Sequence, residues 1–204
     1  MSSLGLAISI ISIILLLVCY LGLAVFYDRL GSLHMRVRDF IMSTRRPWLD
    51  PIMRATHTIN GAVSMSVITA LVALLLGLYW KGWKDAFLMT AAMVGVTAII
   101  HATKAIHKSN RPPQIIVEIL MKTYSYPSGH SAASMTFALV VPMFLGLHLN
   151  PAVVSIIAVF LLINAVATAY GRMYLDMHWL ADILGGWCMA GIVTIITHML
   201  LTIV

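Results

Sequence analysis

The chain alternates long apolar runs with short polar segments. Each run comes close to the ~20 apolar residues that a helix needs to cross a hydrocarbon core of about 30 Å. Inside a bilayer only helices and closed barrels satisfy all their backbone hydrogen bonds. The first run is too long for a cleaved signal peptide and lacks a basic start, so we expect it to be retained as a span. The pattern predicts six transmembrane helices, at residues 4–27, 61–80, 86–103, 130–147, 152–170 and 180–203.

Composition supports this interpretation. Hydrophobic residues make up 61% and charged residues 10% of the 204 residues, whereas soluble domains have roughly half and a quarter. Together with a mean hydropathy of +0.96, this excludes an ordinary soluble domain. We expect an all-α, polytopic membrane protein with short interfacial helices and an active site at one membrane face. The length suits one domain, so residues 1–204 are expected to form a single integral-membrane domain.

Two stretches between the runs differ in character. Residues 28–59 carry apolar side chains near helical spacing and are interrupted by Pro47 and Pro51, which predicts one or two short amphipathic helices at the membrane interface. Residues 109–127 are expected to be irregular, with a short helix or a lid at residues 115–121. The arginines of the first stretch are expected to form a solvated, lipid-facing surface rather than catalytic groups: Arg29, Arg36, Arg38, Arg45, Arg46 and Arg54.

Three polar clusters stand at the ends of apolar runs. They extend from Lys104 to Pro112, from Tyr126 to His130 and from Arg172 to Asp182. An even number of spans places both termini on one side of the membrane. The ends of the third and fifth runs and the starts of the fourth and sixth then lie on the other side. We therefore expect all three clusters to converge on one membrane face.

The third cluster contains a histidine and a carboxylate at helical spacing. His178 and Asp182 are four residues apart, so in a helix their side chains would share one face. The carboxylate could accept a proton from one imidazole nitrogen, fix the tautomer and leave the other nitrogen free to attack an electrophile. The simpler interpretation is an ordinary i, i+4 pair at a helix start.

The second cluster precedes an apolar run. Ser128 is a good N-cap residue, and Gly129 lets the backbone come close to a ligand. Backbone amides at a helix start point toward anions, and His130 could protonate a leaving oxygen. The alternative is a helix cap beside an interfacial histidine.

Three cations accompany these groups. Lys104, Arg111 and Arg172 lie near the expected membrane surface, where basic side chains commonly extend to lipid headgroups. Fixed cations also stabilise the negative charge on a transferring phosphoryl group. Three cations beside two histidines and a carboxylate fit phosphate chemistry.

The order Lys-x6-Arg-Pro, Pro-Ser-Gly-His and Arg-x5-His-x3-Asp resembles the motifs of the type 2 phosphatidic acid phosphatase superfamily. That family includes membrane lipid phosphatases and the soluble vanadium-dependent haloperoxidases. The resemblance implies that His178 is a nucleophile that forms a phosphohistidine and that Asp182 orients it. It also implies that His130 protonates the leaving group and later activates water.

The resemblance further implies metal-free chemistry without a cofactor, and no carboxylate cluster is visible in the sequence. The third motif departs from the family pattern, because Gly171 stands where a serine is usual. A hydroxyl contact near the phosphate is therefore expected to be missing, although every charged group is present. The phosphate-binding groups implied by the motifs are Lys104, Arg111, Ser128, Gly129 and Arg172.

The charge balance bears on partners and orientation. With a net charge of +6 and no nucleic-acid-binding pattern, we expect anionic lipid headgroups or a phosphorylated lipid as partners. Of the 13 lysines and arginines, all but Lys81 and Lys84 fall on the expected motif face. The positive-inside rule would place that face in the cytoplasm. The bacterial members that the chain resembles mostly work on the outer face of the inner membrane, and a site for phosphate lipids is itself basic. We therefore expect a multi-pass protein of the inner (plasma) membrane with an extracytoplasmic active site.

The leading hypothesis is hydrolysis of a phosphate monoester or diphosphate from a membrane lipid, such as undecaprenyl diphosphate, phosphatidylglycerol phosphate or phosphatidic acid. A lipid-to-lipid phosphotransferase would use the same residues, and the sequence does not separate the two. A transporter or flippase could bind headgroups in the same pocket, although transport sites tend to lie at mid-bilayer. The choice of lipid and the oligomeric state stay open.

Overall fold

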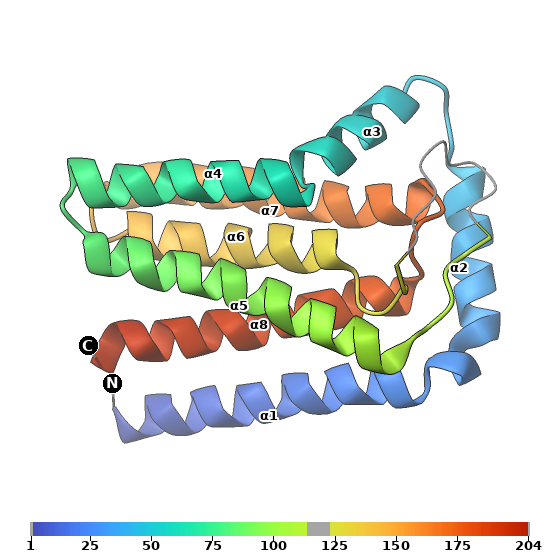
Figure 1. Ribbon diagram of the computed structural model, residues 1–204, viewed down its shortest axis with the longest axis horizontal. Coiled ribbons are helices and arrows are strands. Elements are labelled where there is room, and N and C mark those ends of the chain that lie inside the picture. The colour runs from blue at the N-terminus through green and yellow to red at the C-terminus, as the bar shows by residue number, and fades with distance from the viewer. Residues whose placement is uncertain (1, 114–122, 204) are drawn as a thin grey trace.

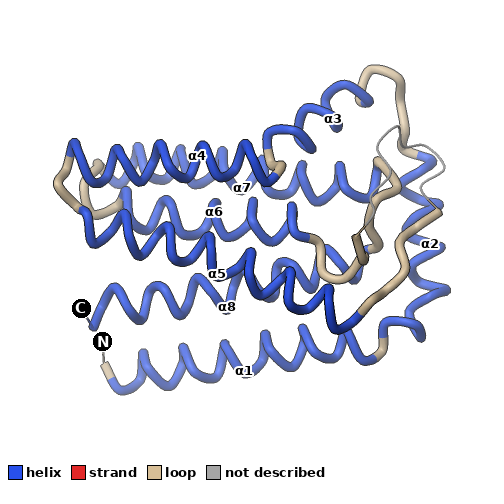
Figure 2. The backbone as a smooth tube through the Cα atoms, in the orientation of Figure 1, coloured by secondary structure: helices blue, strands red, loops and turns tan. Residues whose placement is uncertain are grey.

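A computed structural model describes residues 2–113 and 123–203, so the expected helix or lid at residues 115–121 lies outside the described residues. Within these ranges the protein consists of helices, turns and loops, with no strand (Figure 2). The long helices are α1 (Ser3–Val25), α4 (Ala62–Leu74), α5 (Trp83–His107), α6 (Gly129–Leu145), α7 (Pro151–Tyr174) and α8 (Leu180–Ile203). The shorter elements are a 3-10 turn (Tyr27–Leu30), α2 (Gly31–Ser43), α3 (Asp50–Ile59) and a π-helical turn (Leu75–Tyr79) that continues α4.

The long helices follow the apolar runs. Within the described ranges, five helices are long and apolar enough to cross a membrane: α1, α4 with its π turn, α5, α7 and α8. The remaining expected span corresponds to α6, which is shorter at 17 residues and contains Pro142. The all-helical membrane fold is thus confirmed, while a sixth span stays a prediction. Both α5 and α7 extend about one turn beyond the expected ends, which brings Lys104 and Arg172 inside helices.

The two ends of the bundle differ. Both termini lie at one end, together with the short α4–α5 and α6–α7 turns (Figure 1). At the other end lie α2, α3 and the connections that precede α6 and α8 (Figures 1 and 2). Because α6 packs against α5, α7 and α8, the polar ends of these helices meet there. The expected convergence of the three clusters on one face is confirmed.

Two glycines of α8 allow the second cluster to pack closely against this helix. A Cβ on Gly185 would stand 2.5 Å from the ring of Tyr126, and a Cβ on Gly186 would stand 2.9 Å from the carbonyl oxygen of Ser128. The backbone N–H of Ser128 also donates to the carbonyl of Asp182 at 2.9 Å. The absence of side chains at both glycines therefore lets the loop before α6 lie directly on α8.

The interfacial segment forms two helices, as expected, but its arginines are not all lipid-facing. Arg38 of α2 makes two hydrogen bonds, of 2.7 and 2.9 Å, to the carboxylate of Asp176, whose side chain is fully buried. Arg45 pairs with Asp50 at 3.0 Å. The prediction of a purely solvated surface is wrong for these two: Arg38 pairs with the loop that follows α7, and Arg45 pairs with the first residue of α3. The remaining arginines of the segment are exposed: Arg29, Arg36, Arg46 and Arg54.

Candidate active site

Members of all three polar clusters line one cavity of about 640 Å³. The cavity begins at the end of the bundle that carries α2 and α3 and continues between α4, α5 and α6. Its polar end is lined by Lys104, Arg111, Gly129, His130, Arg172 and His178. Six of the eight candidate residues therefore lie around one space, whereas Asp182 and Ser128 do not line it.

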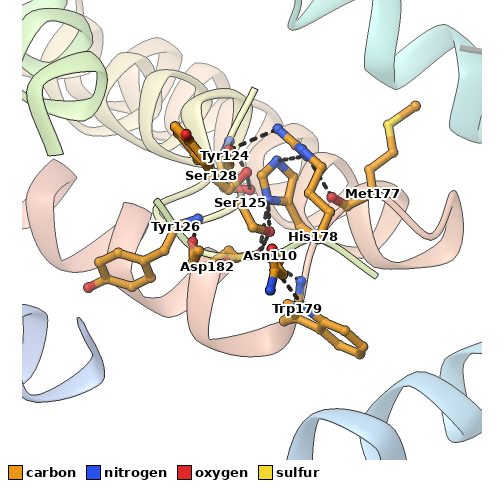
Figure 3. A network of polar contacts seen from close by, with 12 residues as sticks. Asn110, Tyr124, Ser125, Tyr126, Ser128, Met177, His178, Trp179 and Asp182 are labelled. Atoms are coloured by element: carbon orange, nitrogen blue, oxygen red, sulfur yellow. Dashed lines mark hydrogen bonds and ion pairs between the residues drawn. The ribbon is translucent and has the colours of Figure 1, made fainter. Parts of the chain in front are cut away.

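His178 lies at the centre of a hydrogen-bond network (Figure 3). Its Nδ1 is 3.0 Å from Oδ2 of Asp182, and its Nε2 is 3.2 Å from Nη1 of Arg111. The two residues do not share one helix: His178 stands in the loop just before α8 begins at Leu180, which is also where the sixth span was expected to begin. The pair still meets, since Asp182 lies in the first turn of α8 and its side chain reaches back to the preceding loop.

The network determines which nitrogen of His178 carries the proton. A guanidinium group can only donate hydrogen bonds, so Nε2 must accept from Arg111, and Nδ1 carries the hydrogen that it donates to Asp182. Burial, and then the charges of Arg172, Arg111 and Lys104, hold the pKa of His178 well below its usual range. The imidazole is therefore neutral, with its lone pair on Nε2, which is the form required of a nucleophile.

Asp182 is fully buried and held by several donors. Its Oδ2 also accepts from the backbone N–H of Trp179 at 2.8 Å and from the Ser125 hydroxyl. Its Oδ1 accepts from the Tyr27 hydroxyl at 2.8 Å. Burial, and then the nearby charge of Asp182, raise the pKa of Tyr27, so this phenol stays protonated and continues to donate. These bonds fix the orientation of the carboxylate toward His178.

Two of the cations are held by backbone carbonyls of the loop before α6. Lys104 donates to the carbonyls of Tyr124 and Ser125, the latter at 2.8 Å. Arg111 donates to the carbonyls of Thr123 and Tyr124 at 2.6 and 3.1 Å. It also donates to the carbonyl of Met177 at 2.7 Å, which places its guanidinium between this loop and the loop that carries His178.

Arg172 is held differently. It is 1% exposed, and its Nη1 donates to Nδ1 of His57. Its Nε and Nη2 are buried and have no hydrogen-bond partner among the described residues. Buried polar groups in proteins are nearly always paired, and a buried cation is stabilised by an anion. The arrangement is that of a cationic site suited to an anionic ligand.

The two polar residues at the start of α6 have different surroundings. His130 lines the cavity, and its ring stacks on His57, with centroids 4.8 Å apart and planes inclined by 15°. Ser128 is fully buried at the N-cap, where its Oγ accepts from the backbone N–H of Ser131 and contacts the Ser131 hydroxyl. The capping interpretation of Ser128 is thus confirmed, and a phosphate contact from its hydroxyl stays a prediction.

Sequence reasoning missed several neighbours of these groups. Ser125 stands three residues before Ser128, close enough to the second cluster to have been noticed. Tyr27 stood at the end of the first expected span and His57 within the interfacial segment 28–59, and nothing in the local pattern connects either to the site. His101 of α5 is exposed and also lines the cavity.

The described residues offer no metal site of protein ligands. Within residues 2–113 and 123–203, no group of three or more His, Cys, Asp or Glu side chains is placed to hold a metal ion. What the arrangement provides is a neutral imidazole oriented by a carboxylate, a second imidazole on the same cavity and three buried or half-buried cations. Such a set of groups can bind a phosphate group and attack its phosphorus.

Comparisons with known proteins agree with this description. The chain is 26% identical over 148 residues to phosphatidylglycerophosphatase B of Bacillus subtilis, covering 70% of each protein. It is 33% identical over 75 residues to an undecaprenyl-diphosphatase of Sulfolobus acidocaldarius, covering 37% of this chain and 32% of that protein.

Solved structures show the same fold. A crystal structure of a transmembrane PAP2 type phosphatidylglycerolphosphate phosphatase from Bacillus subtilis superposes with a TM-score of 0.88, at 20% identity, over 95% of this chain and 97% of that chain. The structure of LpxE from Aquifex aeolicus gives a TM-score of 0.63 at 22% identity, over 82% and 95% of the two chains.

The family model of the PAP2 superfamily matches residues 85–202. This range includes all three motifs and extends over more than half of the chain. The resemblance inferred from the motifs is therefore confirmed, and the chain belongs to the PAP2 superfamily.

Proposed function

We propose that this chain, a lipid phosphatase of the PAP2 superfamily, removes the terminal phosphate group from a membrane lipid that carries a phosphate monoester or a diphosphate, through a phosphohistidine on His178. The observation that carries the proposal is the state of His178. Its Nδ1 hydrogen is directed to Asp182 at 3.0 Å, and its Nε2 lone pair faces Arg111 at 3.2 Å. The same residue lines a cavity with Lys104 and Arg172.

The first step transfers the phosphoryl group to the protein. The substrate phosphate takes over the N–H groups of Arg111 that hold Nε2, and Nε2 attacks phosphorus as the P–O bond to the lipid breaks. The imidazolium that results keeps its Nδ1 hydrogen bond to Asp182, whose negative charge stabilises it. The cations stabilise the charge on the equatorial oxygens. His130 donates its proton to the departing oxygen, so the lipid leaves as an alcohol or a monophosphate.

The second step returns the enzyme to its starting state. His130, now neutral, removes a proton from a water molecule whose oxygen attacks phosphorus. The P–N bond breaks, its electron pair returns to Nε2, and inorganic phosphate leaves. The negative charge of the bound phosphate favours the protonated form of His130 before the first step, because an adjacent anion stabilises a cation.

The shape of the cavity supports a lipid substrate. Along α5 its lining extends from Lys104 to Thr90, a length of about 21 Å at 1.5 Å per residue. Lining residues on both α4 and α5 are exposed on the bundle surface, among them Ser66, Ala70 and Ala98. A chain of a lipid can therefore lie between these two helices while its headgroup reaches His178. Candidate substrates are undecaprenyl diphosphate, phosphatidylglycerol phosphate and phosphatidic acid, and the named activities of the two relatives support the first two.

We place the site on the extracytoplasmic face of the inner (plasma) membrane. By the positive-inside rule, the excess of basic residues on that face favours a cytoplasmic site instead. Many of these residues have a role in the fold or the site, however, since Arg38 and Arg45 form ion pairs and three further cations line the cavity. Labelling of single cysteines introduced at exposed positions at either end of the bundle, in intact cells, tests this placement.

The decisive experiment measures phosphate release by purified protein in detergent from a panel of phospholipids and prenyl diphosphates, with His178→Ala as control. We expect release from at least one lipid and none from the variant, together with an acid-labile phosphoenzyme in the wild type after rapid quenching. Labelled phosphate appearing on a second lipid instead of in water would identify a phosphotransferase. Release by His178→Ala at the wild-type rate would refute the mechanism.

A further inference from the structure

The interfacial helix α3 contributes a histidine to the site. His57 lies near the end of α3 (Asp50–Ile59), far in sequence from the three motifs. Its Nδ1 contacts Nη1 of Arg172, and its ring stacks on His130 at a centroid distance of 4.8 Å. One side chain from outside the motifs therefore touches both a phosphate-binding cation and the proposed proton donor.

The contact with Arg172 defines the state of this histidine. Since the guanidinium can only donate, Nδ1 of His57 must carry a lone pair, and the ring must be neutral with its hydrogen on Nε2. Burial, and then the charge of Arg172, lower the pKa of His57 to about 4, which agrees with a neutral acceptor. With Nη1 held in this way, the other two nitrogen atoms of the planar guanidinium group, Nε and Nη2, keep a fixed orientation.

The approach of α3 depends on Gly171. A Cβ at this position would stand 2.9 Å from Oγ1 of Thr56 and 3.4 Å from Sδ of Met53. The first distance is shorter than real Cβ atoms show, so a serine or an alanine here would force Thr56 to shift and would disturb its hydrogen bond to the carbonyl of Met53. Thr56 directly precedes His57, just as Gly171 directly precedes Arg172. The glycine that departs from the usual motif is thus the residue that lets His57 reach its neighbours.

We propose that His57 is a positioning residue of this active site, holding the Arg172 guanidinium for the substrate phosphate, and that Gly171 provides the space it requires. The predicted effect of His57 on turnover rests on the function proposed above. The predicted effect of His57 on anion binding does not depend on that function.

Two substitutions at position 57 distinguish the role of the hydrogen-bond acceptor from that of the aromatic ring. His57→Asn keeps an acceptor atom close to the position of Nδ1 but removes the ring, whereas His57→Phe keeps a ring that can stack on His130 but removes the acceptor. In His57→Phe the Nη1 group of Arg172 loses its acceptor. We expect kcat/KM to fall by about tenfold to a hundredfold, mainly through a higher KM. His57→Asn should stay within about fivefold of wild type. The matched control is His198→Phe, an exposed histidine of α8 near the opposite end of the bundle.

Binding of inorganic phosphate gives a readout that does not require turnover. Added phosphate should raise the Tm of the wild type, of His57→Asn and of His198→Phe, and should raise the Tm of His57→Phe far less. If the wild type releases no phosphate from any lipid, the proposed function fails while this comparison still tests His57. An equal phosphate response in His57→Phe and wild type, or equal losses of kcat/KM in His57→Phe and His57→Asn, would overturn the positioning role.

The part played by Gly171 is tested by a double-mutant cycle. Gly171→Ala should lower kcat/KM by about tenfold or more, because displacement of a positioned group by a fraction of an ångström is enough. Adding Thr56→Ala, which removes the atom that the new Cβ would meet, should restore most of the loss. Full activity in Gly171→Ala alone, or no recovery in the double variant, would refute this part.

Discussion

Replacement of Gly186 by alanine tests whether the close contact between α8 and the loop before α6 sets the geometry of the site. The new Cβ would stand 2.9 Å from the carbonyl oxygen of Ser128 and 3.1 Å from the backbone nitrogen of Ala132. Both neighbours are backbone atoms, so neither can rotate away. The segment that carries His130 must then move relative to α8 and to His178.

The size of the effect follows from two opposing contributions. Alanine in place of glycine within a helix stabilises by roughly 0.5–1 kcal/mol. Overpacking a tight contact typically destabilises by about 1–3 kcal/mol. The net change in the free energy of unfolding is therefore a loss of between zero and about 2.5 kcal/mol, less than the typical stability of a folded domain. Relief of the contact to an ordinary separation needs a shift of roughly half an ångström, and catalytic groups displaced by ~1 Å lose about a hundredfold in rate. We expect kcat to fall by about tenfold to a hundredfold.

The assay is phosphate release from a short-chain phosphatidic acid in detergent, with Tm measured on the same preparation. Gly95→Ala is the matched control, because a Cβ at that glycine of α5 meets nothing within 4 Å. It should keep wild-type activity and an equal or higher Tm. If Gly186→Ala works within about twofold of wild type while folding normally, the close contact does not set the position of His130.

Three further results are expected. Tyr27→Phe removes the donor to Oδ1 of the fully buried Asp182 and should lower the free energy of unfolding by about 1.5–3 kcal/mol; an unchanged Tm would contradict the bond. The double substitution Ser66→Leu and Ala98→Leu fills the exposed cavity lining between α4 and α5, so hydrolysis of long-chain lipids should fall by about tenfold or more while a short soluble phosphate ester is still cleaved; equal losses for both would reject entry between these helices. Because the pKa of His178 is lowered in the folded protein, the unfolded chain binds a proton near pH 6.5 that the folded one does not. As the pH falls below about 6.5, the free energy of unfolding should therefore decrease by up to ~1.4 kcal/mol per pH unit. The Tm of His178→Asn should decline less steeply with acidification than that of the wild type. Identical slopes of Tm against pH in the two proteins would count against a buried neutral imidazole at position 178.

The sequence predicted the helices well for a simple physical reason. Long apolar runs satisfy their backbone hydrogen bonds in a bilayer by forming helices, so α1 and α8 appear close to their expected bounds, and α7 differs mainly by about one further turn at its end. The sequence also predicted that the three motifs lie at the same end of the bundle, because each stands at the same end of its neighbouring apolar run when successive runs alternate in direction.

The parts of the site that escaped prediction are contacts between residues distant in sequence. Tyr27 reaches Asp182 across 155 positions, and His57 reaches Arg172 across 115. Neither contact leaves a periodic pattern, because each depends on where the interfacial segment packs against the helix ends. The cap formed by Ser128 was foreseeable from its local sequence, but the exclusion of its side chain from the cavity lining depends on the position of α8.

The cavity that opens between α4 and α5 also affects how the products separate. The dephosphorylated lipid can return sideways into the bilayer, whereas inorganic phosphate dissolves in the aqueous phase. Each product is therefore diluted in its own phase. The rate should follow the mole fraction of substrate in a micelle or bilayer rather than its bulk concentration, so adding inert detergent at constant total substrate should slow the enzyme.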